Sequence, residues 1–238
     1  MENRKLVVGN MKLHFTVDEV KKYIEEMKDY KDCVICPTYI YLPYFIDNGF
    51  TVGTQDISQY DLGAFTGEVA ASQVKSIGCD YTIVGHSERR EYFKEDNEDI
   101  NDKVKTAIEN GLKVILCVGE TEEERNNGQT NDKVKRQLLN NLKGIEHRYY
   151  DNVIIAYEPV WAIGTGLVPS NNDIQKVVSF IKEVVHDNFD YMPLVLYGGS
   201  TNDQNIEELN SIHIVDGFLV GGACLKPEQF KKIIETTR

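Results

Sequence analysis

Short runs of β-branched and other apolar residues alternate along the chain with longer stretches in which apolar residues recur at helical spacing. Such short apolar runs are typical of buried strands. The pattern predicts eight strands: Lys5–Gly9, Val34–Pro37, Thr51–Thr54, Tyr81–Gly85, Val114–Val118, Val153–Tyr157, Leu194–Tyr197 and Gly217–Val220. It predicts helices between them, among them Val17–Lys28, Ile100–Asn110, Glu122–Leu142, Ile174–Asn188 and Pro227–Thr237.

Regular alternation of strand and helix favours a parallel sheet with right-handed crossovers. Eight such units predict an α/β fold of the closed (β/α)8 barrel type, and 238 residues suit a single domain over residues 1–238. The alternative is a doubly wound open sheet. That fold usually has fewer strands and a glycine-rich first turn, and Val8–Lys12 does not carry its fingerprint. In a barrel, functional residues are expected where the strands end.

Composition narrows the classes of partner. The net charge is −12, from 26 basic and 38 acidic residues, so we expect no nucleic-acid binding. No apolar run approaches the ~20 residues that span a membrane, and Met1–Val8 lacks the apolar region of a signal peptide, so we expect no membrane association and a cytoplasmic location. Cys33 and Cys36 have redox-pair spacing, but strand alternation would turn them to opposite faces, which argues against a redox role.

The segment Ala156–Gly166 carries the strongest chemical signal. A buried strand ends on one carboxylate, Glu158, and a stiff stretch with Pro159 and Trp161 leads into glycines 164 and 166. A lone base beneath a closing lid needs this arrangement. The ordinary alternative is a surface loop whose glutamate caps the next helix, but a tryptophan exposed in such a loop usually covers something.

Two other strand ends offer candidate side chains. Lys12 follows the first strand, either as an ordinary surface cation or as the cation that holds an anionic substrate. His86 follows the fourth strand at the start of a helix, where the helix dipole disfavours a charged imidazole. A neutral imidazole can donate a hydrogen bond to a carbonyl oxygen, although a purely structural capping role is the alternative.

Glycine pairs end the seventh and eighth strands, in Tyr197–Ser200 and Val220–Gly222. Glycine lets backbone amides approach a ligand closely, and the loops after these two strands are the common phosphate site of such barrels. Tight turns are the alternative explanation. A single base, an imidazole and a phosphate site, without a metal-binding cluster, suit proton abstraction beside a carbonyl in a small phosphorylated aldehyde or ketone.

Several segments, taken together and in order, closely resemble the triosephosphate isomerase family, and they run over nearly the whole chain. They are Gly9–Lys12, Gly63–Glu68, Gly85–Arg90, Cys117–Glu120, Ala156–Gly166, Tyr197–Ser200 and Gly217–Gly222.

The resemblance implies interconversion of dihydroxyacetone phosphate and glyceraldehyde 3-phosphate in glycolysis and gluconeogenesis, by a homodimer without a metal or organic cofactor. Glu158 would move the proton between carbons, and His86 would polarise the carbonyl and move protons between oxygens. Lys12 and Asn10 would bind substrate and stabilise the enediolate. The phosphate contacts would come from Gly164, Ser200, Gly221 and Gly222. Two further residues would support the site: Ser87 would hold Glu158, and Glu88 would neighbour Lys12.

The resemblance also implies that the third loop, Asp56–Gly67, reaches into a partner subunit, with Thr66 near its tip. Phe65 supports an interface independently, as a large apolar residue in a loop without core-facing period. The chain departs from the family pattern at Met11, His14, Asp56, Leu167 and Pro169. If Asp56 is buried without a partner, its pKa would be raised and its ionised form would cost stability. If it pairs with His14, that cost would be smaller.

Two rival functions stay open at this point. One is a catalytically silent barrel that only binds phosphorylated ligands or a partner protein, and the other is a different phosphosugar isomerase on the same fold.

Overall fold

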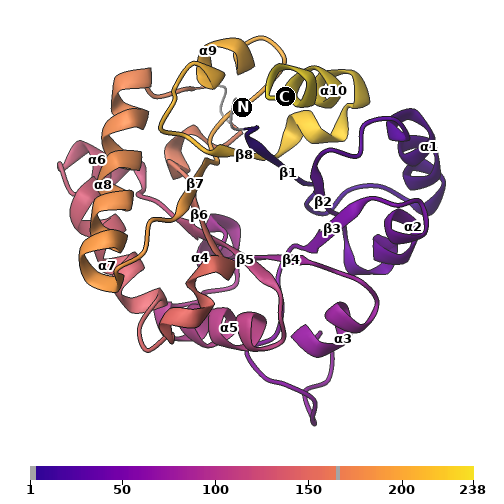
Figure 1. Ribbon diagram of the computed structural model, residues 1–238, viewed down its shortest axis with the longest axis horizontal. Coiled ribbons are helices and arrows are strands. Elements are labelled where there is room, and N and C mark those ends of the chain that lie inside the picture. Colours follow the sequence, from indigo (N-terminus) through magenta and orange to yellow (C-terminus); the bar gives the residue numbers. More distant parts are fainter. Residues whose placement is uncertain (1–3, 165–166) are drawn as a thin grey trace.

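A computed structural model describes residues 4–164 and 167–238, and it shows a closed barrel of eight parallel strands in the order β1 to β8 (Figure 1). The strands are β1 (Leu6–Asn10), β2 (Val34–Cys36), β3 (Thr51–Thr54), β4 (Tyr81–Val84), β5 (Lys113–Val118), β6 (Val153–Tyr157), β7 (Leu194–Tyr197) and β8 (Gly217–Val220). The pairing of β1 with β8 closes the barrel. The predicted (β/α)8 fold is confirmed, and every predicted strand lies within one residue of its observed bounds.

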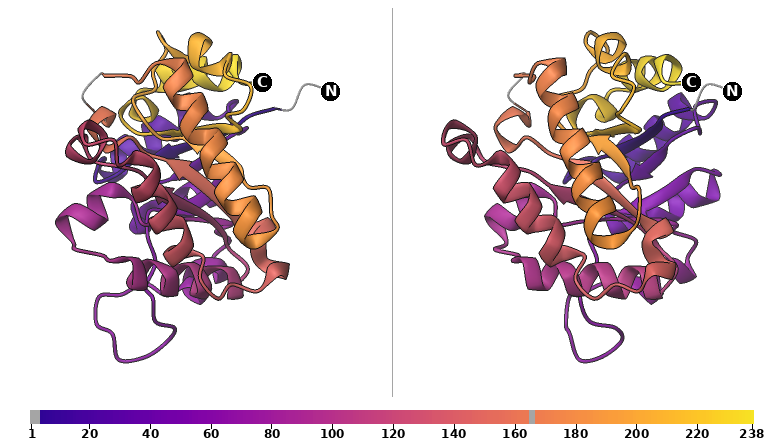
Figure 2. Two further views of the ribbon diagram at one scale, coloured as in Figure 1. Left: turned by 90° about the vertical axis from the view of Figure 1, so that its left-hand side faces the viewer. Right: turned by 60° about the vertical axis from the view of Figure 1, so that its left-hand side comes forward.

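Helices surround the strands on the outside of the barrel (Figures 1 and 2). The α-helices are α1 (Val17–Met27), α2 (Leu42–Asp47), α3 (Ala71–Ser76), α4 (Ser87–Tyr92), α5 (Asn97–Glu109), α6 (Glu122–Asn126), α7 (Thr130–Asn141), α8 (Asn171–Phe189), α9 (Ile206–Asn210) and α10 (Pro227–Thr236). Short 3-10 helices are η1 (Tyr39–Tyr41), η2 (His147–Asn152), η3 (Val160–Ala162) and η4 (Gly222–Leu225).

The prediction of one helix over Glu122–Leu142 was wrong. The structure has two helices, α6 and α7, and Gly128 between them has a φ of +70°, which a continuing right-handed helix cannot accommodate. The apolar period did not reveal this break, because α6 has no buried residue. Helices α5 and α8 begin three residues earlier than predicted, since polar caps rather than apolar spacing mark their starts. The Asp96 side chain accepts from the Glu98 amide at 2.8 Å, and the Ser170 hydroxyl accepts from the Asp173 amide at 3.2 Å.

The strands bury both of their faces along most of their length, which explains why most of their residues are apolar. One cluster fills the barrel interior and includes Val8, Ile83 and Leu196, while a larger cluster lies between the strands and the helices. Cys36 belongs to the interior cluster and Cys33 to the outer one, so the two thiols face opposite ways as predicted. All five cysteines are buried and unpaired within the described chain.

The loop between β3 and α3 stands out from the barrel (Figure 2). This is the loop predicted to reach a partner subunit, and it does not fold back over the barrel surface. The other connections at the carboxyl ends of the strands stay close to the barrel mouth, where they can surround a common cavity (Figure 1).

Candidate active site

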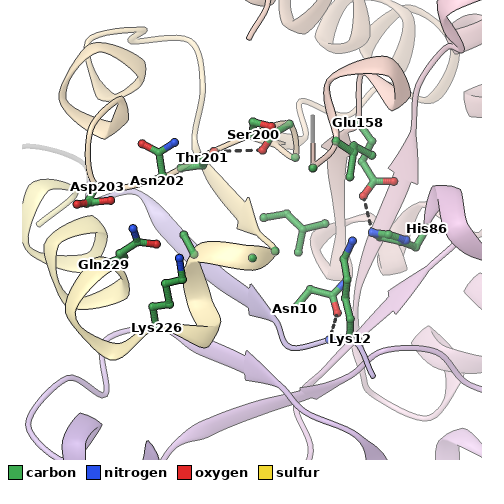
Figure 3. Close-up of a pocket in the computed structure, with 18 of the residues that line it drawn as sticks. Asn10, Lys12, His86, Glu158, Ser200, Thr201, Asn202, Asp203, Lys226 and Gln229 are labelled. Atoms are coloured by element: carbon green, nitrogen blue, oxygen red, sulfur yellow. Dashed lines mark hydrogen bonds and ion pairs between the residues drawn. The ribbon is translucent and has the colours of Figure 1, made fainter. Parts of the chain in front are cut away.

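A cavity of about 490 Å³ opens at the carboxyl ends of the strands. It brings together residues from both halves of the chain (Figure 3). The candidate residues that line it are Asn10, Lys12, His86, Glu158, Gly164, Ser200, Gly221 and Gly222. The supporting candidates Ser87 and Glu88 contact this group from α4, as the distances below show.

Glu158 follows β6 directly and is only 2% exposed. Its Oε1 lies 3.0 Å from His86 Nε2, and its Oε2 accepts the Ser87 backbone N–H at 3.0 Å. Burial acts to raise the pKa of Glu158, but His86, the Ser87 amide and Lys12 outweigh it and leave this pKa lowered. The Glu158 side chain is therefore an ionised carboxylate, held between two partners.

Two glycines leave the space that Glu158 occupies. A Cβ added at Gly119 would lie 1.7 Å from the Glu158 carbonyl oxygen, and one added at Gly198 would lie 2.9 Å from its Cγ. Both positions therefore require glycine if the carboxylate is to keep this place. The sequence reasoning missed both roles, because a glycine that packs against another residue gives no signal distinct from a turn.

His86 is the N-cap residue of α4, and its Nδ1 accepts the Glu88 backbone N–H at 3.3 Å. Since Nδ1 accepts, the ring proton is assigned to Nε2, which donates to Glu158. Burial acts to lower the pKa of His86, but the Glu158 and Glu88 carboxylates outweigh it, so the net pKa is raised. This direction is opposite to the one expected from the helix terminus alone, because that expectation left out the carboxylate beside the ring.

Lys12 adopts a left-handed backbone conformation with a φ of 50°, which is uncommon for a residue with a side chain. Asn10 Oδ1 accepts its backbone N–H at 3.0 Å, and Gln55 Nε2 donates to its carbonyl oxygen at 2.8 Å. Its ammonium lies 2.6 Å from Glu88 Oε1. Strain of this kind persists only where the surroundings fix it, and it aims the ammonium into the cavity (Figure 3). The sequence reasoning missed Gln55.

Two glycines and a hydroxyl line the middle of the cavity, in a part that we call the cradle and define as Ser200, Gly221 and Gly222. The Ser200 hydroxyl donates to the Ala162 carbonyl oxygen at 2.6 Å. A Cβ added at Gly222 would meet no protein atom within 4 Å, so the backbone there faces open space. A Cβ at Gly221 would lie 3.5 Å from Lys12 Cε, which puts the cradle next to the candidate cation.

The tryptophan after Glu158 is only partly exposed, and its ring contacts other side chains. Trp161 is partly buried, its indole N–H donates to Glu120 Oε1 at 3.0 Å, and the Arg125 guanidinium lies 3.7 Å from the ring centroid. The Tyr157 hydroxyl donates to the same Glu120 oxygen at 3.2 Å. Gly166, predicted to loosen the far side of this segment, lies outside the described residues.

Asp56 is buried at the base of the third loop, and the predicted alternative of a pair with His14 was wrong. Its carboxylate contacts the Lys103 ammonium at 2.7 Å and Arg89 Nε at 2.9 Å. Glu95 contacts the same two cations, which completes a group of four charges. Burial raises the pKa of Asp56 to about 6, more than the two cations lower it.

Phe65 and Thr66 lie on the exposed part of the third loop. The Phe65 ring stacks on Tyr60, with centroids 4.0 Å apart, and both rings stay more than two-fifths exposed. Leu62, in the same loop, is 70% exposed. The loop therefore presents an apolar surface away from its own barrel.

Comparison with known proteins gives one family. The family model described as triosephosphate isomerase matches residues 5–237. Triosephosphate isomerase of Dictyoglomus thermophilum is 40% identical over 247 aligned positions, covering 98% of this chain and 99% of the relative. That of Clostridium perfringens is 40% identical over 242 positions, covering 96% and 98%.

The chain belongs to the triosephosphate isomerase family. This membership agrees with the barrel and with the cavity at its mouth. Within the described residues of this family member, no helix has the length and apolar character needed to cross a membrane.

Proposed function

We infer that the protein is an aldose–ketose isomerase that interconverts dihydroxyacetone phosphate and D-glyceraldehyde 3-phosphate. The observation that carries this inference is the contact of Glu158 with His86 at 3.0 Å, in one cavity with Lys12 and a glycine-rich cradle. We propose that it acts in glycolysis and gluconeogenesis, in the cytoplasm and without an organic cofactor or metal.

In the proposed reaction Glu158 removes a proton from the carbon next to the carbonyl and returns it to the neighbouring carbon. The electron pair of the broken C–H bond forms the C=C bond of an enediolate, so no net oxidation occurs. Both Glu158 oxygens are occupied in the free site, one by His86 and one by the Ser87 amide. Substrate must therefore displace the carboxylate from His86 before Glu158 can act on carbon.

His86 is proposed to donate its Nε2 proton to the substrate oxygen and to move protons between the two oxygens. The Glu158 carboxylate is the leading influence that raises the pKa of this imidazole against burial. Once Glu158 turns to the substrate, burial and Lys12 both favour the neutral ring. Asn10 and Lys12 are proposed to bind substrate, and the Lys12 ammonium is proposed to stabilise the negative charge that develops on oxygen.

The cradle and Gly164 are proposed to hold the phosphate. The Gly222 backbone faces open space and the Ser200 hydroxyl lies beside it, so close approach of a phosphate meets no side chain. Amide donors in this part of the cavity explain how a chain with net charge −12 can bind a dianion without a broad basic patch. Lys12, beside Gly221, adds the one cation that the reaction needs.

The segment Pro159–Gly166 is proposed to close over substrate and exclude water from the enediolate. Glu120 supports this role, because it accepts hydrogen bonds from Trp161 within the segment and from Tyr157 on the fixed strand. The segment is thereby anchored to the barrel in the unliganded structure. The hinge that follows it includes the exposed Leu167 and the buried Pro169.

We propose that the protein is a homodimer in which Phe65 and Thr66 meet the partner. Four consecutive strands are each followed by a loop or short helix with a strongly exposed apolar residue, namely Leu13, Ile40, Leu62 and Phe93. Because these strands are neighbours in the barrel, the residues share one side of its mouth. A solvated monomer would leave this apolar surface open to water, and a second copy would cover it.

A coupled assay tests the proposed function. Glyceraldehyde 3-phosphate is supplied with glycerol-3-phosphate dehydrogenase, and NADH oxidation reports the dihydroxyacetone phosphate formed. The proposal expects turnover with the triose phosphate and none with pentose or hexose phosphates. Binding of the triose phosphate without turnover would favour the silent barrel, and turnover of a longer phosphosugar alone would favour the other isomerase.

A further inference from the structure

The cavity extends beyond the cradle, away from the proposed catalytic residues. Its volume of about 490 Å³ lies in the range of about 300–1,000 Å³ that accommodates drug-sized ligands, whereas a triose phosphate is much smaller. Figure 3 shows the side chains of Asn202, Asp203, Lys226 and Gln229 around one space, with Ser200 between them and Glu158. We call this space the annex and define it by these four residues.

The loop that carries Asn202 and Asp203 is held in place by hydrogen bonds within itself. Asn202 Oδ1 accepts the backbone N–H of Gln204 at 2.9 Å and that of Asn205 at 3.1 Å. Asn205 Nδ2 donates to the Ser200 carbonyl oxygen at 3.0 Å, which ties the annex to the cradle. These contacts fix the loop before any ligand arrives, and they use the oxygen of the Asn202 amide while leaving its NH₂ group for a ligand.

The polar groups of the annex are not satisfied by one another. Asp203 Oδ1 is buried without a hydrogen-bond partner, although such atoms are rare in native structures. Lys226 is exposed at the rim of the cavity, and within the described part of the chain its ammonium forms no ion pair. Lys226 and Asp203 line the same cavity but do not pair with each other. Because Oδ1 is buried, the acceptor left for a ligand is Asp203 Oδ2, which is neither buried nor hydrogen-bonded among the described residues, and the donor is the Lys226 ammonium.

We propose that the annex binds the hydroxyl groups of phosphorylated polyols and sugars longer than a triose, with their phosphate in the cradle. A hydroxyl both donates and accepts, so it can satisfy Asp203 and Lys226 together. A second anion would be repelled by Asp203, and an apolar group would cover the accessible oxygen of that carboxylate without giving it a hydrogen bond. This inference rests on the proposed phosphate site.

A ligand bound this way points its carbon chain away from Glu158 and His86. It occupies the cradle that the triose phosphate needs, but it places no carbon near the base. Such compounds are therefore competitive inhibitors that are not converted, and their binding links the activity of the isomerase to the supply of longer sugar phosphates.

Calorimetry on the full-length protein tests the annex with two probes that have no carbonyl group, xylitol 5-phosphate and glycerol 3-phosphate. We expect the pentitol phosphate to bind about tenfold more tightly, since it adds hydrogen bonds to charged groups. Asp203→Asn keeps the shape of the side chain. This variant and Lys226→Met should each weaken binding of the pentitol phosphate about fivefold and leave binding of glycerol 3-phosphate unchanged. Lys135→Met, at an exposed position on α7, is the matched control and should leave both affinities unchanged.

The outcomes separate the annex from the proposed function. Equal affinities for the two probes in a protein that isomerises triose phosphate would overturn the annex alone. An equal loss of both affinities in Asp203→Asn and Lys226→Met would do the same. If neither glycerol 3-phosphate nor inorganic phosphate binds and triose phosphate is not converted, the proposed function is overturned and the annex with it.

Discussion

Replacing Asp56 with asparagine tests whether the buried charge at the base of the third loop costs stability. Asp56 is 8% exposed and lies against two cations, Lys103 and Arg89, and one acid, Glu95. Burial, the largest influence, raises its pKa from 3.8 to about 6. Asparagine has nearly the same shape and can still accept a hydrogen bond, but it cannot ionise.

The pKa fixes the sign and the size of the effect. The folded chain holds the Asp56 proton more tightly than the unfolded chain does. The contribution of Asp56 to the free energy of unfolding is therefore fully present below 3.8, its pKa in the unfolded chain. This contribution is lost as the pH rises through about 6, its pKa in the folded chain. Each pKa unit is about 1.4 kcal/mol, so the loss amounts to about 3 kcal/mol at pH 8. Asp56→Asn should escape this loss.

Urea unfolding at a low and a high pH measures the difference. The two proteins should have similar free energies of unfolding near pH 4, and Asp56→Asn should be more stable by up to about 3 kcal/mol at pH 8. The protein concentration must be kept constant, because an oligomer gains stability by mass action. Asp29→Asn, at an exposed position after α1, is the matched control and should show no such pH dependence. An Asp56→Asn protein less stable than the parent at pH 8 would refute the reasoning, since the ion pairs would then outweigh burial.

Three further substitutions test the cradle, the lid anchor and the interface. Ser200→Asp should raise KM for triose phosphate at least about tenfold, because like charges placed together cost several kcal/mol, and inorganic phosphate should lose its inhibition in parallel. Glu120→Ala removes the oxygen to which Trp161 and Tyr157 donate, so acrylamide should quench the single tryptophan more strongly and the free energy of unfolding should fall by about 1–3 kcal/mol. Thr66→Arg forces a bulky cation into the proposed interface, so sedimentation should show monomers and turnover should fall steeply, whereas a fully active monomer would contradict the dimer proposal.

The fold was predictable because most strands are apolar on both faces and each long helix repeats its apolar residues at regular spacing. The break at Gly128 was not predictable this way, since α6 buries no residue and its polar sequence continues the pattern of a surface helix. The short helices α2, α3 and α9 were missed for a related reason, because five or six residues are too few to display a period, whereas the start of α4 was expected at His86.

The chemical residues at the site were predictable because each ends a strand, and the barrel brings strand ends together. Some of their contacts were also predicted, since the resemblance placed Ser87 beside Glu158 and Glu88 beside Lys12, but others were not. The sequence could not reveal that His86 and Glu158 touch, which reverses the expected direction of the His86 pKa. It also could not reveal that Asp56 meets Lys103 and Arg89 rather than His14, because those partners come from α5 and α4 and depend on how these helices pack against the third loop.

The most direct test of the account is to run the isomerisation in D₂O with the parent protein and with Glu158→Gln. If the Glu158 carboxylate moves the proton between carbons, the proton can exchange with solvent, and the product should carry deuterium on carbon. The turnover of Glu158→Gln should fall by a factor of about 10²–10⁴ or more. Glu183→Gln, at an exposed position on α8, should keep the turnover of the parent protein. Near-native turnover by Glu158→Gln, or undiminished deuterium incorporation by that variant, would contradict the assignment of Glu158 as the base.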